Sequence, residues 1–160
     1  MTDAELLVAA LRERGWTLGV AESLTGGAVA SEIVSVPGAS ATLLGGVVAY
    51  ATPVKHTLLD VDAGLLAEHG AVHPDVAAQM AEGVRRAVAV DARRADVGIA
   101  TTGIAGPDSP DGQPVGTVHI GVVAPTGASS IPHLFTGTRA EIRAQATAAA
   151  IAAALDAVRE

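Results

Sequence analysis

The sequence contains no cysteine, few aromatic residues and few basic residues. The absence of cysteine excludes a disulfide framework, a thiolate nucleophile and a Cys-ligated zinc or iron–sulfur site. Only Trp16, Tyr50 and Phe135 are aromatic, which argues against a platform for stacking nucleic-acid bases. Ten Lys and Arg residues stand against 17 Asp and Glu residues, so the net charge is −7. Without a basic stripe, nucleic acid is not expected as a partner.

Long hydrophobic runs are also missing, although 49% of the residues are hydrophobic. Gly, Thr, Asp or Arg interrupts every apolar stretch well before the roughly 20 residues that a membrane-spanning helix needs. The N-terminal residues MTDAE are acidic and lead into an amphipathic segment, so they do not form a signal peptide. We therefore expect no membrane partner and a cytoplasmic location.

The sequence does contain enough apolar material for one domain spanning residues 1–160. A domain of this length buries roughly two-thirds of its unfolded surface, so it needs no metal or disulfide to hold it. The charged fraction of 17% is too low for a disordered chain.

Short apolar runs alternate with helical patterns along the chain. The runs are continuous, which is typical of a sheet covered on both faces. We therefore predict an α/β fold: a three-layer α/β/α sandwich with a mixed, mostly parallel sheet of about five strands. The predicted strands are residues 17–21, 43–50, 95–101, 115–123 and 129–135, the last two forming a hairpin. The predicted helices are residues 3–14, 28–34, 53–59, 62–69, 74–87 and 139–158, with Thr52 as the N-cap of the third.

The last predicted helix is unusually rich in alanine. Two apolar stripes run along it, formed by Ala146, Ala149, Ala150 and Ala153 and by Ile151, Leu155 and Val158. A helix that is apolar on more than one side is buried. We therefore predict a homo-oligomer, a dimer or larger, with this helix against another subunit.

The first candidate site is the segment ESLTGG, residues 22–27, between a predicted strand and a predicted helix. Open α/β sheets place ligands at such strand ends, and N–H groups at a helix start bind anions. Ser23 at this corner is a candidate nucleophile, with N–H groups around Thr25, Gly26 and Gly27 available to an oxyanion or substrate. The alternative is that Ser23 or Thr25 merely caps the helix.

Tyr50 and Lys55 form the second candidate site, on either side of Thr52-Pro53. A cation in the first turn of a helix opposes the helix dipole, which lowers the lysine pKa. A lysine with a lowered pKa serves as a general base. The alternative is a solvated lysine beside a tyrosine at the edge of the core.

The segment TTGIAGPD, residues 101–108, is a Gly-rich loop after a predicted buried strand. It matches neither the GxGxxG pattern nor the P-loop, so it does not indicate a dinucleotide or nucleoside-triphosphate site. We predict that it shapes a pocket wall, which makes Thr102, Gly103 and Gly106 candidate substrate-binding residues.

Arg139 and Arg143 lie four residues apart in the first turns of the last predicted helix, where acidic residues are normally preferred. Two arginines placed against the dipole indicate an anionic partner such as a phosphate. The alternative is that they pair with Glu141 or another acid.

Histidine spacing gives no support for a metal site. The five histidines form neither HExxH nor a close pair at metal-ligand spacing: they are His56, His69, His73, His119 and His133. We therefore expect no metal and no organic cofactor.

Several short segments follow one another in an informative order: AESLTGG (21–27), VAY (48–50) with Lys55, GAV (70–72), TGIAGP (102–107), PVGTV (114–118) and Gly137-x-Arg139-x3-Arg143. In this order they resemble the CinA C-terminal domain family, over nearly the whole chain from Glu5 to Val158. Each segment alone is a weak indicator of the family, whereas the combination is specific.

The resemblance implies a nicotinamide-nucleotide amidase, which deamidates nicotinamide mononucleotide to nicotinate mononucleotide and ammonia in pyridine-nucleotide and NAD recycling. It implies that Ser23 is the nucleophile, Lys55 the base and Tyr50 an orienting or relaying partner. Some family members carry a further N-terminal domain with pyrophosphatase-type activity, and this sequence resembles the stand-alone form. Two positions depart from the family pattern: Leu24, where cysteine is usual, and His73, where serine is common.

A rival interpretation is a non-catalytic nucleotide-binding or scaffold domain of a competence-associated protein. Such a domain would share the Gly-rich loops and the arginines but would not need Lys55 near Ser23. A separation of those side chains well over about 5 Å would favour it. A third interpretation, hydrolysis of a different small amide, stays open from the sequence.

Overall fold

Helix ends in this protein coincide with residues suited to them, as the computed structural model of residues 1–160 shows. Thr2 and Glu5 form a capping box at the start of helix α1 (Asp3–Arg14), and Gly15 ends that helix with a left-handed φ of 66°. Thr138 and Glu141 form a second capping box at the start of α6 (Arg139–Arg159). These local patterns are the reason the two ends were predictable.

The other helices are α2 (Ala28–Val34), α3 (Thr52–Leu59), α4 (Ala63–His69) and α5 (Pro74–Ala87), with a short 3₁₀ turn η1 (Ala39–Ala41). The strands are β1 (Leu18–Glu22), β2 (Leu43–Val48), β3 (Val97–Gly103), β4 (Thr117–Ala124) and β5 (Gly127–Leu134). Strand order in the sheet is β2-β1-β3-β4-β5. β1 pairs in parallel with β2 and β3, whereas β4 runs antiparallel to both of its neighbours. Only β4 opposes the rest, so the predicted mixed, mostly parallel sheet is confirmed.

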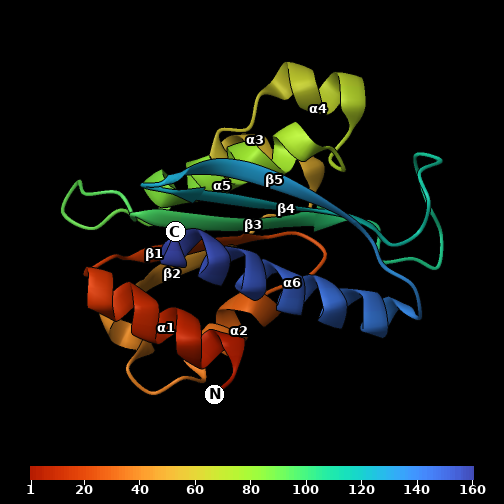
Figure 1. Cartoon of the computed structure of the whole chain (residues 1–160). Helices are drawn as coiled ribbons and strands as arrows, with labels where there is room; N and C mark the ends of the chain where they lie inside the picture. Colours follow the sequence, from red (N-terminus) through yellow and green to blue (C-terminus); the bar gives the residue numbers. More distant parts are fainter.

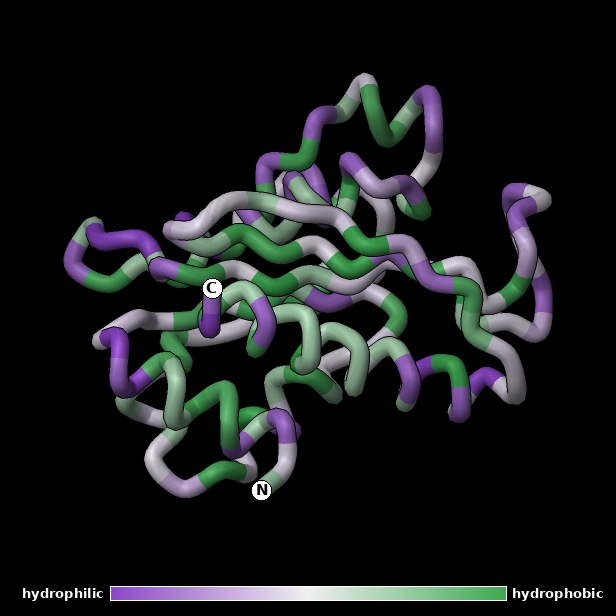
Figure 2. The backbone as a smooth tube through the Cα atoms, viewed as in Figure 1, coloured by the Kyte–Doolittle hydropathy of each residue, from purple (hydrophilic) through white to green (hydrophobic).

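Helices cover both faces of the sheet, which gives the predicted three layers (Figure 1). The helices α1, α2 and α6 pack on one face, with Leu7, Leu11 and Ile142 buried in the larger core. The helices α3, α4 and α5 lie on the other face, with Val76 and Met80 in the smaller core. Figure 2 shows hydrophobic residues along the central strands and hydrophilic ones toward the outer loops.

Helix α6 buries most of its apolar stripes within the chain. Ala146, Ala150, Ile151, Leu155 and Val158 belong to the core that α6 shares with α1 and the sheet. Ala149 and Ala153 of the predicted stripes are only partly buried there, and homo-oligomerisation stays a prediction. No helix of the protein combines the length and the apolar character needed to cross a membrane.

The predicted strand boundaries differ from the observed ones by up to two residues: β3 is Val97–Gly103 and not 95–101, and the segment between β2 and α3 also differs. The predicted strand 43–50 ends at Val48, because the carbonyl groups of Ala49 and Tyr50 turn toward Lys55 and leave the ladder. Helix α3 starts one residue earlier than predicted, so its N-cap is Ala51 and not Thr52. The shifts between β2 and α3 arise from contacts with a side chain that sequence patterns do not place.

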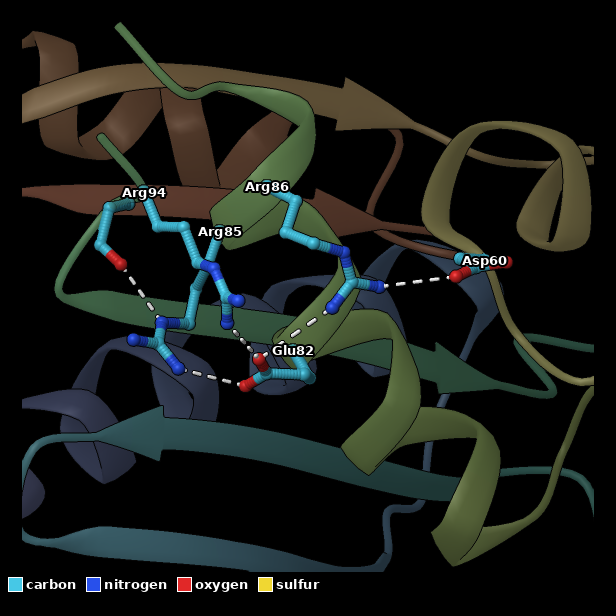
Figure 3. Close-up of polar contacts among 6 residues, drawn as sticks. Asp60, Glu82, Arg85, Arg86 and Arg94 are labelled. Atoms are coloured by element: carbon cyan, nitrogen blue, oxygen red, sulfur yellow. Dashed lines mark hydrogen bonds and ion pairs between the residues drawn. The ribbon is translucent and has the colours of Figure 1, made fainter. Parts of the chain in front are cut away.

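Arginines gather where α5 meets the start of β3 (Figure 3). Glu82 lies 2.8 Å from Arg85, 3.3 Å from Arg94 and 3.7 Å from Arg86. Arg85 also donates to the carbonyl of Ala95 at 2.8 Å. This network connects the basic end of α5 to the start of β3. Its arginines are occupied by structural ion pairs and hydrogen bonds.

Helix α5 also lies unusually close to the sheet, over two glycines on neighbouring strands. A Cβ atom built on Gly98 of β3 would lie 1.9 Å from the Ala81 carbonyl oxygen, and one on Gly121 of β4 would lie 2.2 Å from the Ala77 oxygen. No side chain fits in this contact. The two glycines therefore set the distance between α5 and the sheet.

The substitution Gly121→Ala tests this contact. We expect the free energy of unfolding to fall by about 1–3 kcal/mol, because overpacking displaces α5. Gly64→Ala in α4 is the control, since its Cβ would meet no other element and only the side-chain oxygen of Asp62, the N-cap of α4, at 3.2 Å. Chemical denaturation measures the free energy of unfolding of both variants. Equal stability of the two variants would contradict the close-packing argument.

Candidate active site

A cavity of about 300 Å³ opens at the edge of the sheet where the parallel strands end. It lies between the turn after β1, the segment after β2 and the end of β3. The lining residues are Ser23, Leu24, Tyr50, Thr52, Lys55, Ala71, Val72, Thr102, Gly103, Ile104, Ala105, Gly106, Asp108, Pro110 and Arg139. This is the edge at which open α/β sheets bind ligands.

Ser23 and Lys55 meet in this cavity, although 32 residues separate them in the sequence. The Lys55 Nζ atom lies 3.0 Å from Ser23 Oγ. Ser23 is 8% exposed and Lys55 only 1%. The strand β1 places Ser23 at its end, and α3 brings Lys55 over it. The pair is within hydrogen-bond reach and largely shielded from water.

Three oxygen atoms surround the Lys55 amine. Besides Ser23 Oγ, they are the carbonyl oxygens of Ala49 at 2.7 Å and Tyr50 at 3.1 Å. Burial lowers the pKa of Lys55 from 10.5 to about 8. When the amine is neutral, its two N–H bonds go to the carbonyl groups, which only accept, and its lone pair is left for the Ser23 hydroxyl proton. The arrangement is therefore suited to deprotonating Ser23.

Tyr50 contributes to this cluster through its main chain. Its side chain is 62% exposed, and its phenol oxygen accepts a hydrogen bond from Arg139 at 3.2 Å. The phenol group forms no hydrogen bond with Ser23 or Lys55. The phenol thus lies at the cavity mouth, and the direct contact expected of a proton relay is absent from this structure.

The turn that carries Ser23 is anchored by Glu22 and Thr101. The Glu22 carboxylate is buried and accepts the N–H groups of Val29 and Ala30 at 2.9 and 3.1 Å. It thereby fills the start of α2, where the sequence predicts an anion site. The Thr101 carbonyl accepts from Ser23 N at 3.1 Å, which fixes the other side of the turn.

Four predicted binding residues lie outside the cavity lining. Thr25 is fully buried and its hydroxyl pairs with that of Thr101 at 2.8 Å. The Gly26 N–H group donates to the Ser23 carbonyl at 3.1 Å, and Gly27 precedes α2 as its N-cap. Arg143 donates to the carbonyl groups of the Ser23 turn from behind. None of them lines the space that would hold a substrate.

The other four predicted binding residues do line the cavity. Thr102, Gly103 and Gly106 form its wall, as the interpretation of the Gly-rich loop expects. The Thr102 hydroxyl donates to the Ala71 carbonyl at 2.7 Å and holds the loop before α5 against that wall. Arg139 lies at the mouth and donates to the Gly106 carbonyl at 2.6 Å. Of the two arginines, Arg139 is the one beside the cavity.

Sequence reasoning gave no role to Glu22, Thr101 or Asp108. Asp108 lines the cavity, and the other two hold the Ser23 turn. The position of Glu22, directly before the serine and seven residues before the N–H group it binds, was the available signal. No three His, Asp or Glu side chains are brought together in an arrangement that could hold a metal.

Comparison with known proteins identifies the family to which this chain is similar. The family profile described as CinA C-terminal domain matches residues 2–158. A CinA-like protein from Frankia casuarinae is 48% identical over 149 residues, which cover 93% of this chain and 32% of that protein. The chain therefore spans about a third of the length of the curated relatives it matches.

Solved structures match over almost their whole length. A competence-damaged protein (CinA) superfamily protein from Klebsiella pneumoniae 700603 superposes with a TM-score of 0.91 at 32% identity, covering 98% of this chain and 96% of that one. The competence damage-inducible protein A from Klebsiella pneumoniae MGH 78578 gives a TM-score of 0.87 at 33% identity, with the same coverage. This chain belongs to the CinA C-terminal domain family.

Proposed function

We propose that this domain is a nicotinamide-nucleotide amidase that hydrolyses nicotinamide mononucleotide to nicotinate mononucleotide and ammonia. The observation that carries the proposal is the contact between the Ser23 hydroxyl and the buried Lys55 amine at 3.0 Å. A hydroxyl beside a base of lowered pKa is the combination that acyl transfer needs. The identity of the substrate is inferred from the family resemblance, and the reaction type is inferred from the groups in the cavity.

The distance between Lys55 Nζ and Ser23 Oγ also bears on the rival interpretation of a non-catalytic binding or scaffold domain. Such a domain has no need to bury a lysine against a serine. Burying an amine away from water costs free energy, because the charged form loses its hydration. A contact of 3.0 Å at a side chain that is 1% exposed therefore supports catalysis.

In the first step, neutral Lys55 accepts the Ser23 hydroxyl proton while Ser23 Oγ bonds to the carboxamide carbon. The carbonyl oxygen becomes an oxyanion, which main-chain N–H groups of the Ser23 turn stabilise. The tetrahedral intermediate then collapses as the bond to nitrogen breaks, and the Lys55 ammonium returns the proton to the leaving nitrogen, which departs as ammonia. A nicotinoyl ester on Ser23 remains.

In the second step, water attacks the ester carbon and gives a proton to Lys55. The bond between Ser23 Oγ and the carbon breaks, and Ser23 recovers its proton from Lys55. Nicotinate mononucleotide leaves, and the enzyme returns to its starting state. Each proton that Lys55 accepts is given back, so the cycle balances without a cofactor.

Arg139 is the candidate ligand for the 5′-phosphate. It lines the cavity mouth, and its guanidinium group reaches both Tyr50 and Gly106 there. Guanidinium groups bind phosphate through paired, charge-assisted hydrogen bonds. A phosphate held at the mouth would orient the nicotinamide ring toward Ser23.

Ammonia release tests the nucleophile. We expect Ser23→Ala to abolish ammonia release from nicotinamide mononucleotide without loss of the fold, because no other hydroxyl replaces Ser23 Oγ beside Lys55. Wild type is screened in parallel on nicotinamide, its riboside, its mononucleotide and the dinucleotide. Ser31→Ala, on the exposed face of α2, is the matched control and should keep full activity. Full activity of Ser23→Ala would remove the covalent mechanism.

The pH dependence tests the base. Lys55 accepts a proton only when it is neutral, so kcat/KM should rise about tenfold per pH unit below pH 8 and level off above it. Lys55→Ala should lower the rate by at least about 100-fold. A wild-type profile that is flat between pH 6 and 9, or a loss below about tenfold in the variant, would assign the base to another group.

Substrate comparison tests the phosphate ligand. We expect Arg139→Ala to raise KM for nicotinamide mononucleotide at least about tenfold, because one charge-assisted contact to the phosphate is lost. The same substitution should leave KM for nicotinamide riboside, which has no phosphate, nearly unchanged. Arg159→Ala, at the exposed end of α6, is the matched arginine control. Equal effects of Arg139→Ala on both substrates would contradict the assignment.

A further inference from the structure

We propose that Arg143 is a positioning residue that builds the oxyanion hole of Ser23, and not a ligand of the substrate phosphate. The inference rests on the proposed function for its natural substrate. It depends on how the Arg143 guanidinium binds the Ser23 turn and on which N–H groups of that turn are left without a partner.

Arg143 binds two consecutive carbonyl groups of the turn. Its Nε atom donates to Leu24 O at 2.8 Å, and a terminal nitrogen donates to Thr25 O at 3.2 Å. The contact joins residues 119 positions apart in the sequence. A planar guanidinium with two bonds to adjacent peptides fixes the orientation of both peptide planes.

Fixing the carbonyl groups also fixes the N–H groups. In a trans peptide, the C=O and N–H bonds point in opposite directions. The peptide from Leu24 to Thr25 is trans, because the only cis bond of the chain lies between Gly106 and Pro107. The Thr25 carbonyl that Arg143 holds shares its peptide with the Gly26 N–H group. That N–H group donates to the Ser23 carbonyl and so orients the Leu24 N–H group, which belongs to the same peptide as the Ser23 carbonyl.

The hydrogen bonds of the turn show which donors are free. Ser23 N donates to Thr101, and Gly26 N donates to the Ser23 carbonyl. The N–H groups of Leu24 and Thr25 form no hydrogen bond within the chain. Thr25 is fully buried and Leu24 lines the cavity beside Ser23. Because a substrate cannot reach the N–H group of a residue that is 0% exposed, the Leu24 N–H group at the cavity wall is the one suited to a transient oxyanion.

These contacts separate the two arginines that the sequence treats alike. Both nitrogens of Arg143 that reach the turn are committed to carbonyl groups, and Arg143 is absent from the cavity lining. Arg139 lines that cavity. Arg143 thus acts through the main chain of Leu24 and Thr25 and does not meet the substrate.

Acylation by p-nitrophenyl acetate tests the inference without the nucleotide. Attack of Ser23 Oγ on this ester forms an acetyl-enzyme and releases p-nitrophenolate, so the burst amplitude counts active sites and the burst rate reports acylation. We expect Arg143→Ala to lower the burst rate about 100-fold, as for loss of one oxyanion donor, while the amplitude is kept. With nicotinamide mononucleotide, kcat should fall by a similar factor and KM should change little.

A conservative variant and an arginine control complete the experiment. Arg143→Lys keeps a cationic donor group on one nitrogen in place of the forked pair, and it should lose less acylation rate than Arg143→Ala. Arg159→Ala should match wild type in rate and amplitude. A lower amplitude at an unchanged rate would mean that Arg143 only stabilises the fold, and it would overturn the inference.

Three other outcomes are also decisive. A raised KM for the mononucleotide alone, with the riboside and the ester unaffected, would make Arg143 a phosphate ligand and overturn the inference. A wild-type burst without ammonia release from the mononucleotide would reject the proposed substrate and still test Arg143 on the ester. Wild-type release of p-nitrophenolate no faster than that of Ser23→Ala would overturn both, because it removes the nucleophile.

Discussion

The contact between a buried amine and a hydroxyl is the interaction on which the site depends. An amine in water stays protonated at neutral pH and is no base for a serine. Packing α3 over the end of β1 removes Lys55 from water, and the pKa falls to about 8 for that reason. The carbonyl groups of Ala49 and Tyr50 then satisfy the two N–H bonds of the neutral amine, so that the lone pair is directed at Ser23.

The turn around Ser23 is held by three elements: α2, which follows it directly, and β3 and α6, which are distant in the sequence. Glu22 binds it to α2, Thr101 to β3 and Arg143 to α6. Each anchor is a hydrogen bond to the main chain, so the turn is ordered before any ligand arrives. Preorganised donors contribute more to catalysis than mobile ones, because they need no reorganisation during the reaction.

The charged residues at the two ends of strand β3 have different roles. Where β3 begins, Glu82 forms ion pairs with three arginines that hold α5 in place (Figure 3). Where β3 ends, Arg139 lies at the cavity mouth. The chain carries a net charge of −7, which repels an anionic substrate at long range. Attraction of a phosphate would therefore be a local property of the cavity mouth.

Local patterns determined much of this protein. The caps at Thr2 and Thr138 and the continuous apolar strands predict the elements and the layered fold, because they depend on neighbouring residues only. The same patterns and the family resemblance pointed to Ser23 and Lys55. Sequence spacing treats Arg139 and Arg143 as equivalent, and only the tertiary structure puts one at the cavity mouth and the other behind the turn. That choice depends on how α6 packs against α1, α2 and the strands β3 and β4, a long-range contact that no local pattern encodes.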